Sequence, residues 1–587
     1  MAIPPETASG QTPPSTDAGK VLYADDSAAA ILRPHLESLN RPAGPAWKVV
    51  KQNPSRTVYA GAIAGKEVYL KHFHGRSLGH RLAAFLGYKR AMKELDLASH
   101  LGRNGVSATP ILAAMSDGST EWVVSSAVAP AVPANVWHAR QLEAGSDGAA
   151  AIRRATVALA DMIGKMHAAG VSHDDLHCGN ILVRAGGGEL VLMDLHRARR
   201  RRRLGRRARA ANLAQLLYDR CDWTTRTDRL RFLKRYLQAA RPGAGGTLRG
   251  WVAMIEDAAA RHRARQYASE EGKIYGRNRY FAPMRLRGGW RGRVMLTQRM
   301  PPGRFDEPPR EFTAAAWREA LGDVDSLFAG EGVQVVKDSR SGRVIRRRLD
   351  VGGHRLDVYI KRPRRKYAWK AIIDCFRSSR PKRAFALGHA LLIRNIPTAL
   401  PLAFLQRRAG PLLVDSILIT ETVEGSRLND FLATWLADPP RGNAAIDRRE
   451  QHRLAQDVIF RLGRLLQRLH DNNFAHRDLK ETNMIVRWSP GRKPDIVLLD
   501  LDGLRRVRKI TTRRRFQGLM RLNVSLLTCP TVNPAGRLRM LLGYLRRPGC
   551  GRIDFKTPWR VLEQWSEKKL RRQIASNRRK QKAQRVG

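Results

Sequence analysis

The chain has 587 residues, enough for more than one domain, and its apolar content of 43% can supply ordinary globular cores. Its 107 Lys and Arg against 52 Asp and Glu give a formal net charge of +55, which predicts an acidic partner: a phosphorylated glycan, an anionic membrane surface or a nucleic acid. No apolar run reaches the roughly 18 residues of a membrane span. The 5 cysteines are few and odd in number, and no pair has metal-binding spacing, which favours reduced thiols in a cytosolic protein.

Along the first half of the chain, the patterns predict a small sheet followed by helices. Residues 1–20 are rich in Pro, Ser and Thr and lack an apolar signal core, so we expect a disordered segment. An alternating run then predicts a strand that ends at Lys71. A helix is predicted over about residues 86–101, a strand over 122–124 and a second helix over 151–169.

The second of these helices leads into a polar loop with an informative order. Residues 173–180 read His-Asp-Asp-Leu-His-Cys-Gly-Asn, and an apolar strand follows that ends in Asp194. Within the loop, Asp175 and Asn180 have Asp-x-x-x-x-Asn spacing. A catalytic loop followed by a strand that ends in a metal-binding Asp is the order found in kinases.

The same constellation returns in the second half of the chain. Residues 476–483 read His-Arg-Asp-Leu-Lys-Glu-Thr-Asn, with Asp478 and Asn483 at the same spacing, and the next apolar strand ends in Asp500. Another alternating run ends in Lys361. Two complete sets in one order favour two related domains over a chance echo.

The repeat extends to an amphipathic helix after each motif, over residues 229–237 and 537–545. The expected fold class is therefore α+β: two tandem bilobal protein-kinase-like domains, each with a small antiparallel-sheet N-lobe and a mostly helical C-lobe. We place kinase-like domain 1 at 21–271, a linker dense in Gly, Pro and Arg at 272–309, kinase-like domain 2 at 310–566 and a basic C-terminal tail at 567–587. Because a helix in that tail would be polar nearly all round, we expect the tail to be frayed.

The chemistry of phosphoryl transfer explains these residue types. The reaction needs a carboxylate at the attacking hydroxyl and oxygen ligands that hold Mg²⁺ against the phosphates of ATP. A Lys upstream should grip those phosphates. We therefore expect catalysis by Asp175 and Asp478, metal binding by Asn180, Asp194, Asn483 and Asp500, and ATP binding by Lys71 and Lys361.

The two copies differ at the helix Glu that should pair with the Lys. Glu94 fits this position in the first copy, whereas its register counterpart in the second copy is Ala384. Either another group orients Lys361, or the second copy is impaired. Neither copy has a Gly-x-Gly-x-x-Gly phosphate loop; we interpret Gly61, Gly65, Gly352 and Gly353 as turn glycines.

An Arg-rich segment follows each metal Asp, where a kinase chain lines its substrate site. Because Arg forks bind phosphate and carboxylate bidentately, these segments favour an anionic substrate or membrane surface over a merely solvated loop. The residues are Arg197, Arg199 to Arg203, Arg206, Arg207 and Arg209 in the first copy, and Arg505, Arg506, Arg508, Lys509 and Arg513 to Arg515 in the second.

These motifs resemble the lipopolysaccharide kinase family, which comprises the core heptose kinases, the Kdo kinases and their relatives. The likeness covers the strand ending at Lys71, Glu94, the first polar loop and Asp194, and in the second copy residues 358–361, 388–391 with 396–398, the second polar loop and 499–503. The resemblance implies a protein-kinase-like fold and ATP-dependent phosphorylation of a sugar of the lipopolysaccharide core or a related glycolipid. Two domains in one chain depart from the usual single-domain member and leave a division of labour open.

Two other functions compete with this one. Lys480, two residues after Asp478, is typical of Ser/Thr protein kinases and is included among the ATP-binding candidates. A non-catalytic pseudokinase scaffold could instead bind anionic lipid or nucleic acid. Nucleic acid is the less favoured of these partners, because the sequence shows no basic groove with interleaved aromatic residues that would stack bases. We expect a cytoplasmic kinase in peripheral contact with the inner face of the cytoplasmic membrane.

Overall fold

The computed structural model describes residues 20–53, 56–74, 90–116, 120–184, 188–218, 224–240, 245–297, 310–364, 378–437, 447–490, 493–527, 529–547 and 553–586, with side chains in the last range to 576. The segment expected to be disordered, 1–20, lies outside this part except for its last residue. The chain divides into two compact units, Met1–Ala264 and Arg265–Gly587, which we call domain one and domain two.

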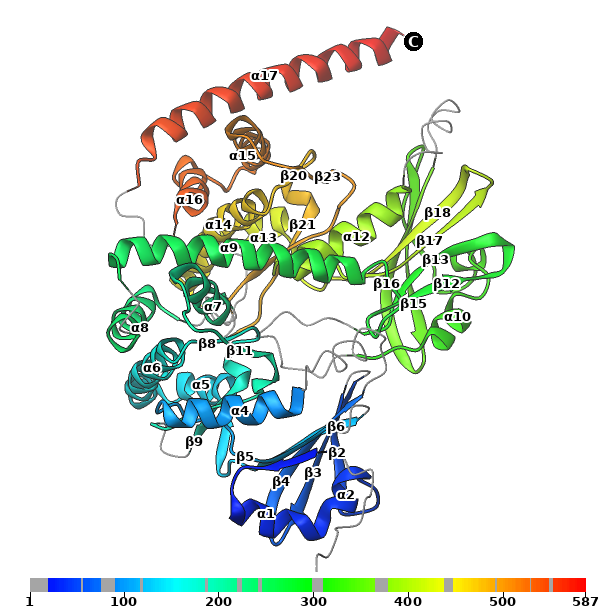
Figure 1. Cartoon of the computed structure of the whole chain (residues 1–587). Helices are drawn as coiled ribbons and strands as arrows, with labels where there is room; N and C mark the ends of the chain where they lie inside the picture. The colour runs from blue at the N-terminus through cyan, green and yellow to red at the C-terminus, as the bar shows by residue number, and fades with distance from the viewer. Residues whose placement is uncertain are drawn as a thin grey trace, which may run out of the picture. The chain divides into compact units, whose positions relative to one another are not determined.

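Domain one begins with a six-stranded antiparallel sheet (Figure 1). The strand order is β1-β5-β6-β4-β3-β2. The strands are β1 (Lys20–Tyr23), β2 (Trp47–Asn53), β3 (Arg56–Ile63), β4 (Lys66–His74), β5 (Ile111–Ser116) and β6 (Thr120–Ser126).

Helices cover both faces of this sheet. On one face lie α1 (Asp26–Leu32), η1 (Arg33–His35) and α2 (Leu36–Asn40), whose apolar residues pack with Val68 and Leu70 of β4. On the other lies α4 (Arg90–Arg103), which packs with Phe73 of the same strand. Since successive side chains of a strand point to opposite faces, Lys71 shares the face of Phe73 and lies toward α4.

The rest of domain one is mostly helical and carries short hairpins. Its core includes the fully buried Tyr236 and Trp251. The helices are α5 (Ala134–Glu143), α6 (Gly145–Ala168), α7 (Arg206–Tyr218), α8 (Arg226–Ala239) and α9 (Leu248–Lys273), with η2 (Cys178–Asn180) and η3 (Leu195–Arg197). The strands β7 (Ala131–Pro133), β9 (Ile181–Arg184) and β10 (Leu190–Leu192) form one sheet, and β8 (Val171–His173) and β11 (Ala198–Arg200) form another.

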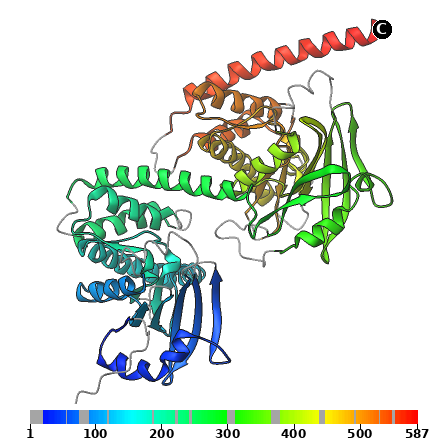
Figure 2. The ribbon, with the colours of Figure 1, turned by 45° about the vertical axis from the view of Figure 1, so that its right-hand side comes forward.

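Domain two repeats this plan with a seven-stranded antiparallel sheet, whose strands lie side by side in Figures 1 and 2. The strand order is β12-β13-β17-β18-β16-β15-β14. The strands are β12 (Phe281–Arg285), β13 (Trp290–Met295), β14 (Gln334–Ser339), β15 (Gly342–Val351), β16 (His354–Pro363), β17 (Pro401–Ala409) and β18 (Leu412–Glu421). This repetition confirms the predicted tandem α+β architecture.

The other elements of domain two follow in the same order as in domain one. The helices are η4 (Arg287–Gly289), α10 (Ala314–Leu321), η5 (Ser326–Phe328), α12 (Arg380–Ile393), α13 (Leu428–Trp435), α14 (Arg448–Asp471), η6 (Glu481–Asn483), α15 (Thr512–Leu527), α16 (Pro534–Leu545) and α17 (Lys556–Val586). The short strands are β19 (Ser426–Arg427), β20 (Phe474–His476), β21 (Met484–Arg487), β22 (Asp495–Leu498) and β23 (Leu504–Arg506), paired β19-β21-β22 and β20-β23.

Of the stretch interpreted as a linker, 272–309, the described residues 272–297 are a structural part of domain two. Strands β12 and β13 pair with each other, and β13 also pairs with β17. Strand β13 therefore takes the place that β1 has beside β5 in domain one. The first residues of domain two also lie earlier than expected. Glu271, at the end of α9, forms ion pairs with Arg394 and Arg506 of domain two.

The basic tail is a helix rather than a frayed segment. The first half of α17 packs on the domain, because Leu562 is fully buried, Ser566 accepts a hydrogen bond from Asn523, and Glu563 pairs with Arg537. From Glu567 to Ser576 nearly all its side chains are exposed. Among the described helices of both domains, none has the length and apolar character needed to cross a bilayer.

Candidate active site

Strand pairing holds both ends of the first polar loop. Strand β8 pairs with β11, and β9 pairs with β10, so the loop between β8 and β9 lies beside the end of β10. The backbone N–H of Met193 donates to the carbonyl of Asn180 at 2.9 Å. The Asn180 amide nitrogen donates to the carbonyl of Asp175 at 2.9 Å, which leaves the amide oxygen as the atom that a cation could use. Asp175, Asn180 and Asp194 therefore lie close together in domain one.

A buried histidine links the loop to Asp194. His173 Nδ1 accepts the backbone N–H of Asp175 at 3.2 Å, and its Nε2 lies 3.2 Å from the carbonyl oxygen of Asp194. Burial lowers the pKa of His173, so the neutral imidazole is favoured. The first contact then requires the proton on Nε2, which donates toward Asp194. His476 of domain two makes both contacts, at 3.2 Å and 2.7 Å.

Lys71 lies between two carboxylates. Its Nζ is 2.6 Å from Glu94 Oε1 and 3.2 Å from Asp194 Oδ1. Burial favours the neutral amine, but the charges of Glu94 and Asp194 outweigh it and raise the pKa of Lys71 above its ordinary value. The amine is thus held charged, and the helix Glu that the sequence singled out is its partner at the side of α4.

Two further cationic or titratable groups surround Asp194, and sequence reasoning missed both. Arg56, the first residue of β3, donates to both carboxylate oxygens at 3.0 and 3.1 Å, and His196 Nδ1 lies 2.6 Å from Oδ1. Burial would raise the pKa of Asp194, but the His196 hydrogen bond and the cations Lys71 and Arg56 hold it well below its usual range. Asp194 itself has a left-handed backbone, with φ of 61°. Only the position of His196, two residues after the Asp, was a signal in the sequence.

Domain two assembles the corresponding residues more loosely. Lys361 Nζ lies 3.5 Å from Asp500 Oδ1, and Asn483 donates to the carbonyl of Asp478 at 3.2 Å. Burial would raise the pKa of Asp500, but Lys361 and the backbone N–H of Asp502 lower it overall. Lys480 Nζ is 2.8 Å from Asp478 Oδ1, so this Lys contacts the expected catalytic carboxylate.

The position of the helix Glu is apolar in domain two. Ala384 is the fifth residue of α12, as Glu94 is of α4, and it is 3% exposed. Asp502 lies near by instead: burial and the neighbouring Asp500 raise its pKa, while Lys361, Arg380 and Arg383 oppose the rise. Lys361 thus lacks the 2.6 Å carboxylate contact that orients Lys71.

The Arg-rich segments divide between solvent-facing and structural roles. Arg197 Nη1 lies 3.9 Å from Asp175, and Arg199 pairs with Asp174 at 2.7 Å, so these two lie at the catalytic loop. The prediction that Arg209 lines the substrate site is wrong, because Arg209 is buried and donates to two backbone carbonyls. In domain two, Arg506 forms an ion pair with Glu271 and Arg515 forms one with Asp471, so these two arginines also have structural roles.

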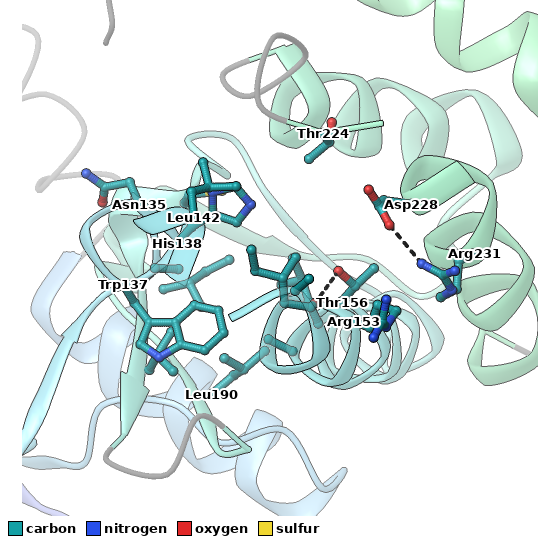
Figure 3. Close-up of a pocket in the computed structure, with 18 of the residues that line it drawn as sticks. Asn135, Trp137, His138, Leu142, Arg153, Thr156, Leu190, Thr224, Asp228 and Arg231 are labelled. Carbon is teal, nitrogen blue, oxygen red and sulfur yellow. Dashed lines mark hydrogen bonds and ion pairs between the residues drawn. The ribbon is translucent and has the colours of Figure 1, made fainter. Parts of the chain in front are cut away.

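A separate cavity of about 430 Å³ lies in the helical part of domain one (Figure 3). Its lining is mostly apolar and comes from α5, α6, α8 and the β9–β10 hairpin; Trp137, Leu142 and Leu190 border it, and Asp228 and Arg231 form an ion pair at its rim. Neither Lys71 nor Asp194 lines it, so it is distinct from the charged cluster.

The charged cluster has the donor chemistry that Mg²⁺ prefers, namely carboxylate and amide oxygens. In domain one these would be Asp194 and Asn180, and in domain two Asp500 and Asn483. Within the described ranges, no group of three or more His, Cys, Asp or Glu side chains is arranged to hold a metal ion. The residues therefore fit an ion held jointly with phosphate oxygens rather than a closed all-protein cage.

Comparison with known proteins decides the family. The model of the lipopolysaccharide kinase (Kdo/WaaP) family matches residues 47–236 and again 336–544. The chain belongs to the lipopolysaccharide kinase (Kdo/WaaP) family. The two matched segments end at Tyr236 and Tyr544, which occupy equivalent places in α8 and α16, so both domains carry the family's sequence pattern.

Two relatives of this family are reported. The chain is 30% identical over 208 residues to the lipopolysaccharide core heptose(I) kinase WaaP of Pseudomonas aeruginosa; the match covers 32% of this chain and 77% of that protein. A solved structure described as WaaP in complex with acyl carrier protein is 25% identical, with 41% of this chain and 98% of that chain covered and a TM-score of 0.33.

Proposed function

We propose that the protein transfers the γ-phosphoryl group of ATP to a sugar hydroxyl of the lipopolysaccharide core or a related anionic glycolipid, and that domain one carries the more complete site. The observation that carries this is the group formed by Lys71, Glu94 and Asp194 beside the loop with Asp175. Family membership and the lipopolysaccharide core heptose(I) kinase relative support the acceptor class.

The proposed chemistry assigns a distinct task to each side chain. Lys71, held charged by Glu94, would bind phosphate oxygens of ATP. Asp175 would accept a hydrogen bond from the acceptor hydroxyl and take its proton as the phosphoryl group transfers. Mg²⁺, bound by Asp194 and Asn180, would neutralise charge on the phosphates. His173 would fix the backbone of Asp175 relative to Asp194 through its two ring nitrogens.

The surroundings of Asp175 favour an anionic acceptor. Arg197 and Arg199 bracket the catalytic loop, and Arg200 to Arg203 are largely exposed beyond them. Exposed Arg forks beside a catalytic carboxylate suit an acceptor that already bears phosphate or carboxylate groups. The same charge would support peripheral contact with the inner face of the cytoplasmic membrane, where we propose the protein acts.

A protein Ser/Thr kinase is the second candidate, and one contact in domain two favours it. Lys480 lies 2.8 Å from Asp478, where it could bridge the catalytic carboxylate and the transferring phosphate. Domain two lacks a helix Glu for Lys361, so we place this candidate behind the first.

The test is phosphate transfer from labelled ATP to core oligosaccharide, with a general protein substrate as the alternative acceptor. Wild type is compared with Asp175→Asn, Asp478→Asn and the double variant. Loss of the general base typically costs about 10²–10⁴ in rate, so we expect Asp175→Asn to lose most sugar phosphorylation. Undiminished transfer by the double variant would refute the proposal, and transfer to protein alone would favour the second candidate.

A further inference from the structure

Arg56 covers the carboxylate that should hold the metal. Its guanidinium donates to Oδ1 of Asp194 at 3.0 Å and to Oδ2 at 3.1 Å, in the two-pronged arrangement that makes Arg–carboxylate pairs strong. The Arg56 side chain is only 13% exposed. Lys71 and His196 both approach Oδ1, whereas Arg56 also takes Oδ2.

The strand register places Arg56 at the phosphate side of the site. In the β3–β4 pair, Arg56 lies opposite Phe73 and Val58 opposite Lys71. Residues directly opposite on antiparallel strands point to the same face, so Arg56 and Lys71 share the face toward Asp194. Arg56 is also the first residue of β3 and pairs with Asn53, the last residue of β2.

Metal binding and this ion pair exclude each other. Mg²⁺ binds carboxylate oxygens at about 2.0–2.1 Å, and an Arg fork on the same two oxygens would be both in the way and repelled by the cation. A mostly buried guanidinium that leaves Asp194 can bind another anion, and the triphosphate that arrives beside Lys71 is one that the proposed function supplies.

We infer that Arg56 is a second phosphate-binding residue of domain one, which holds Asp194 while no nucleotide is bound and passes to the terminal phosphates when Mg·ATP binds. The inference rests on the proposed ATP-dependent function. The Arg56–Asp194 pair then acts as a lock on the metal site: it blocks metal binding at Asp194 until ATP and metal bind together and displace Arg56.

At the corresponding position of the described β15–β16 pair, domain two has no such residue, for a backbone reason. The register position of Arg56 is Gly342, which lies opposite Pro363 and two residues before Val344, the partner of Lys361. Gly342 has φ of 154°, and a Cβ there would lie 2.8 Å from the carbonyl oxygen of Arg362. No side chain fits at this position, so Asp500 is free of this lock and the two domains should respond differently to metal alone.

The test measures binding to the full chain without turnover. The Lys361→Met background weakens the second nucleotide site, and two titrations are run: Mn²⁺ alone, and a non-hydrolysable ATP analogue with Mg²⁺. Arg56→Ala should bind Mn²⁺ several-fold more tightly, because Asp194 is released, yet bind the analogue about 10–100-fold more weakly, because a charge-assisted hydrogen bond to phosphate is lost.

Matched variants separate this role from a structural one. Arg235→Ala removes another two-pronged Arg–carboxylate pair in domain one, with Asp161, and should change neither affinity. Arg56→Lys keeps the charge without the fork and should give intermediate values; it decides the matter if Arg56→Ala does not fold. Weaker binding of both ligands, or unchanged binding of the analogue, would overturn the inference. Absence of analogue binding by wild type would instead overturn the proposed function.

Discussion

Asn212 of α7 bonds both backbone polar groups of His173. Its Oδ1 accepts the His173 N–H at 3.0 Å, and its Nδ2 donates to the His173 carbonyl at 2.6 Å. The same Oδ1 lies 3.0 Å from Nε2 of His167, which bonds Tyr236 through Nδ1. A buried polar chain thus ties α6, α7 and α8 to the start of the catalytic loop.

Domain two keeps part of this hydrogen-bond network but lacks the side-chain amide of Asn212. His470 bonds the hydroxyl of Tyr544 at 2.9 Å, as His167 bonds Tyr236. Gly518 takes the position of Asn212, and a Cβ there would lie 2.8 Å from the His470 ring. The loop of domain two therefore lacks the amide support that domain one has.

Asn212→Ala should destabilise domain one. It leaves buried groups of His173 and His167 without partners, and each such group costs about 1–3 kcal/mol. Urea unfolding should show a lower midpoint, and transfer should fall because the loop loses its support. The control is Gln215→Ala, on the same helix as Asn212. It removes an exposed hydrogen bond to the Asp174 carbonyl and should change stability little. Equal stabilities of the two variants would contradict this reading.

Glu94→Ala should weaken nucleotide binding by domain one. The variant removes the 2.6 Å contact that holds Lys71, and loss of one charge-assisted hydrogen bond corresponds to about 1.5–3 kcal/mol, or roughly a 10–100-fold change. Calorimetric titration with an ATP analogue and Mg²⁺ measures it. Ala384→Gly, at the matching place in domain two, is the control and should leave domain-one binding unchanged. An unaltered affinity in Glu94→Ala would show that Asp194 suffices to place Lys71.

Acid should destabilise both domains over a defined pH range. Burial lowers the pKa of His167 and of His470 from 6.5 to about 4, with nearby Arg209 and Arg515 also opposing protonation. Between pH 6.5 and 4 the unfolded chain therefore binds protons at these groups and the folded chain does not, so stability falls as the pH falls. Each shift corresponds to roughly 3 kcal/mol.

Thermal unfolding between pH 7.5 and 4.5 measures this dependence. The His167→Gln and His470→Gln double variant should show a shallower decline, since neither position then titrates. A decline as steep as that of wild type would assign the acid sensitivity to other groups.

The exposed basic part of α17 should contribute to binding of anionic membranes. Each basic residue near such a surface contributes about 1 kcal/mol, and the attraction fades beyond about 8 Å at physiological salt. Replacing its exposed residues by Ala should therefore weaken sedimentation with anionic liposomes and reduce the salt dependence. The residues are Lys568, Lys569, Arg571 and Arg572.

The control compares neutral with anionic liposomes and adds excess duplex DNA as a competitor. Equal binding to both kinds of liposome would contradict an electrostatic attachment. Complete displacement by DNA would favour nucleic acid as the partner of this charge.

Local spacing was sufficient to predict the repeated loops, the helix that carries Glu94 and the helix that precedes the first polar loop. An Asp-x-x-x-x-Asn loop and a strand ending in Asp are short patterns whose geometry depends on neighbouring residues, and alternation along β4 even indicates the face on which Lys71 lies. Strands β12 and β13 were not predicted, because they are short and rich in Gly, Pro and Arg. Strand β12 is stabilised by pairing with β13, and β13 by pairing with β17, and the periodicity of the sequence does not reveal such partners.

By itself, the sequence determined that the protein has two kinase-like copies and that only one copy has a helix Glu, and it predicted a set of residues in each copy for phosphoryl transfer. Only the tertiary structure decided how these residues are held. Arg56 meets Asp194, and Asn212 meets His173, across 138 and 39 residues of chain. Such contacts form when the sheet and helices pack, and their free energy depends on burial and on the exact approach of polar atoms. Neither quantity is encoded in the spacing of residues along the chain.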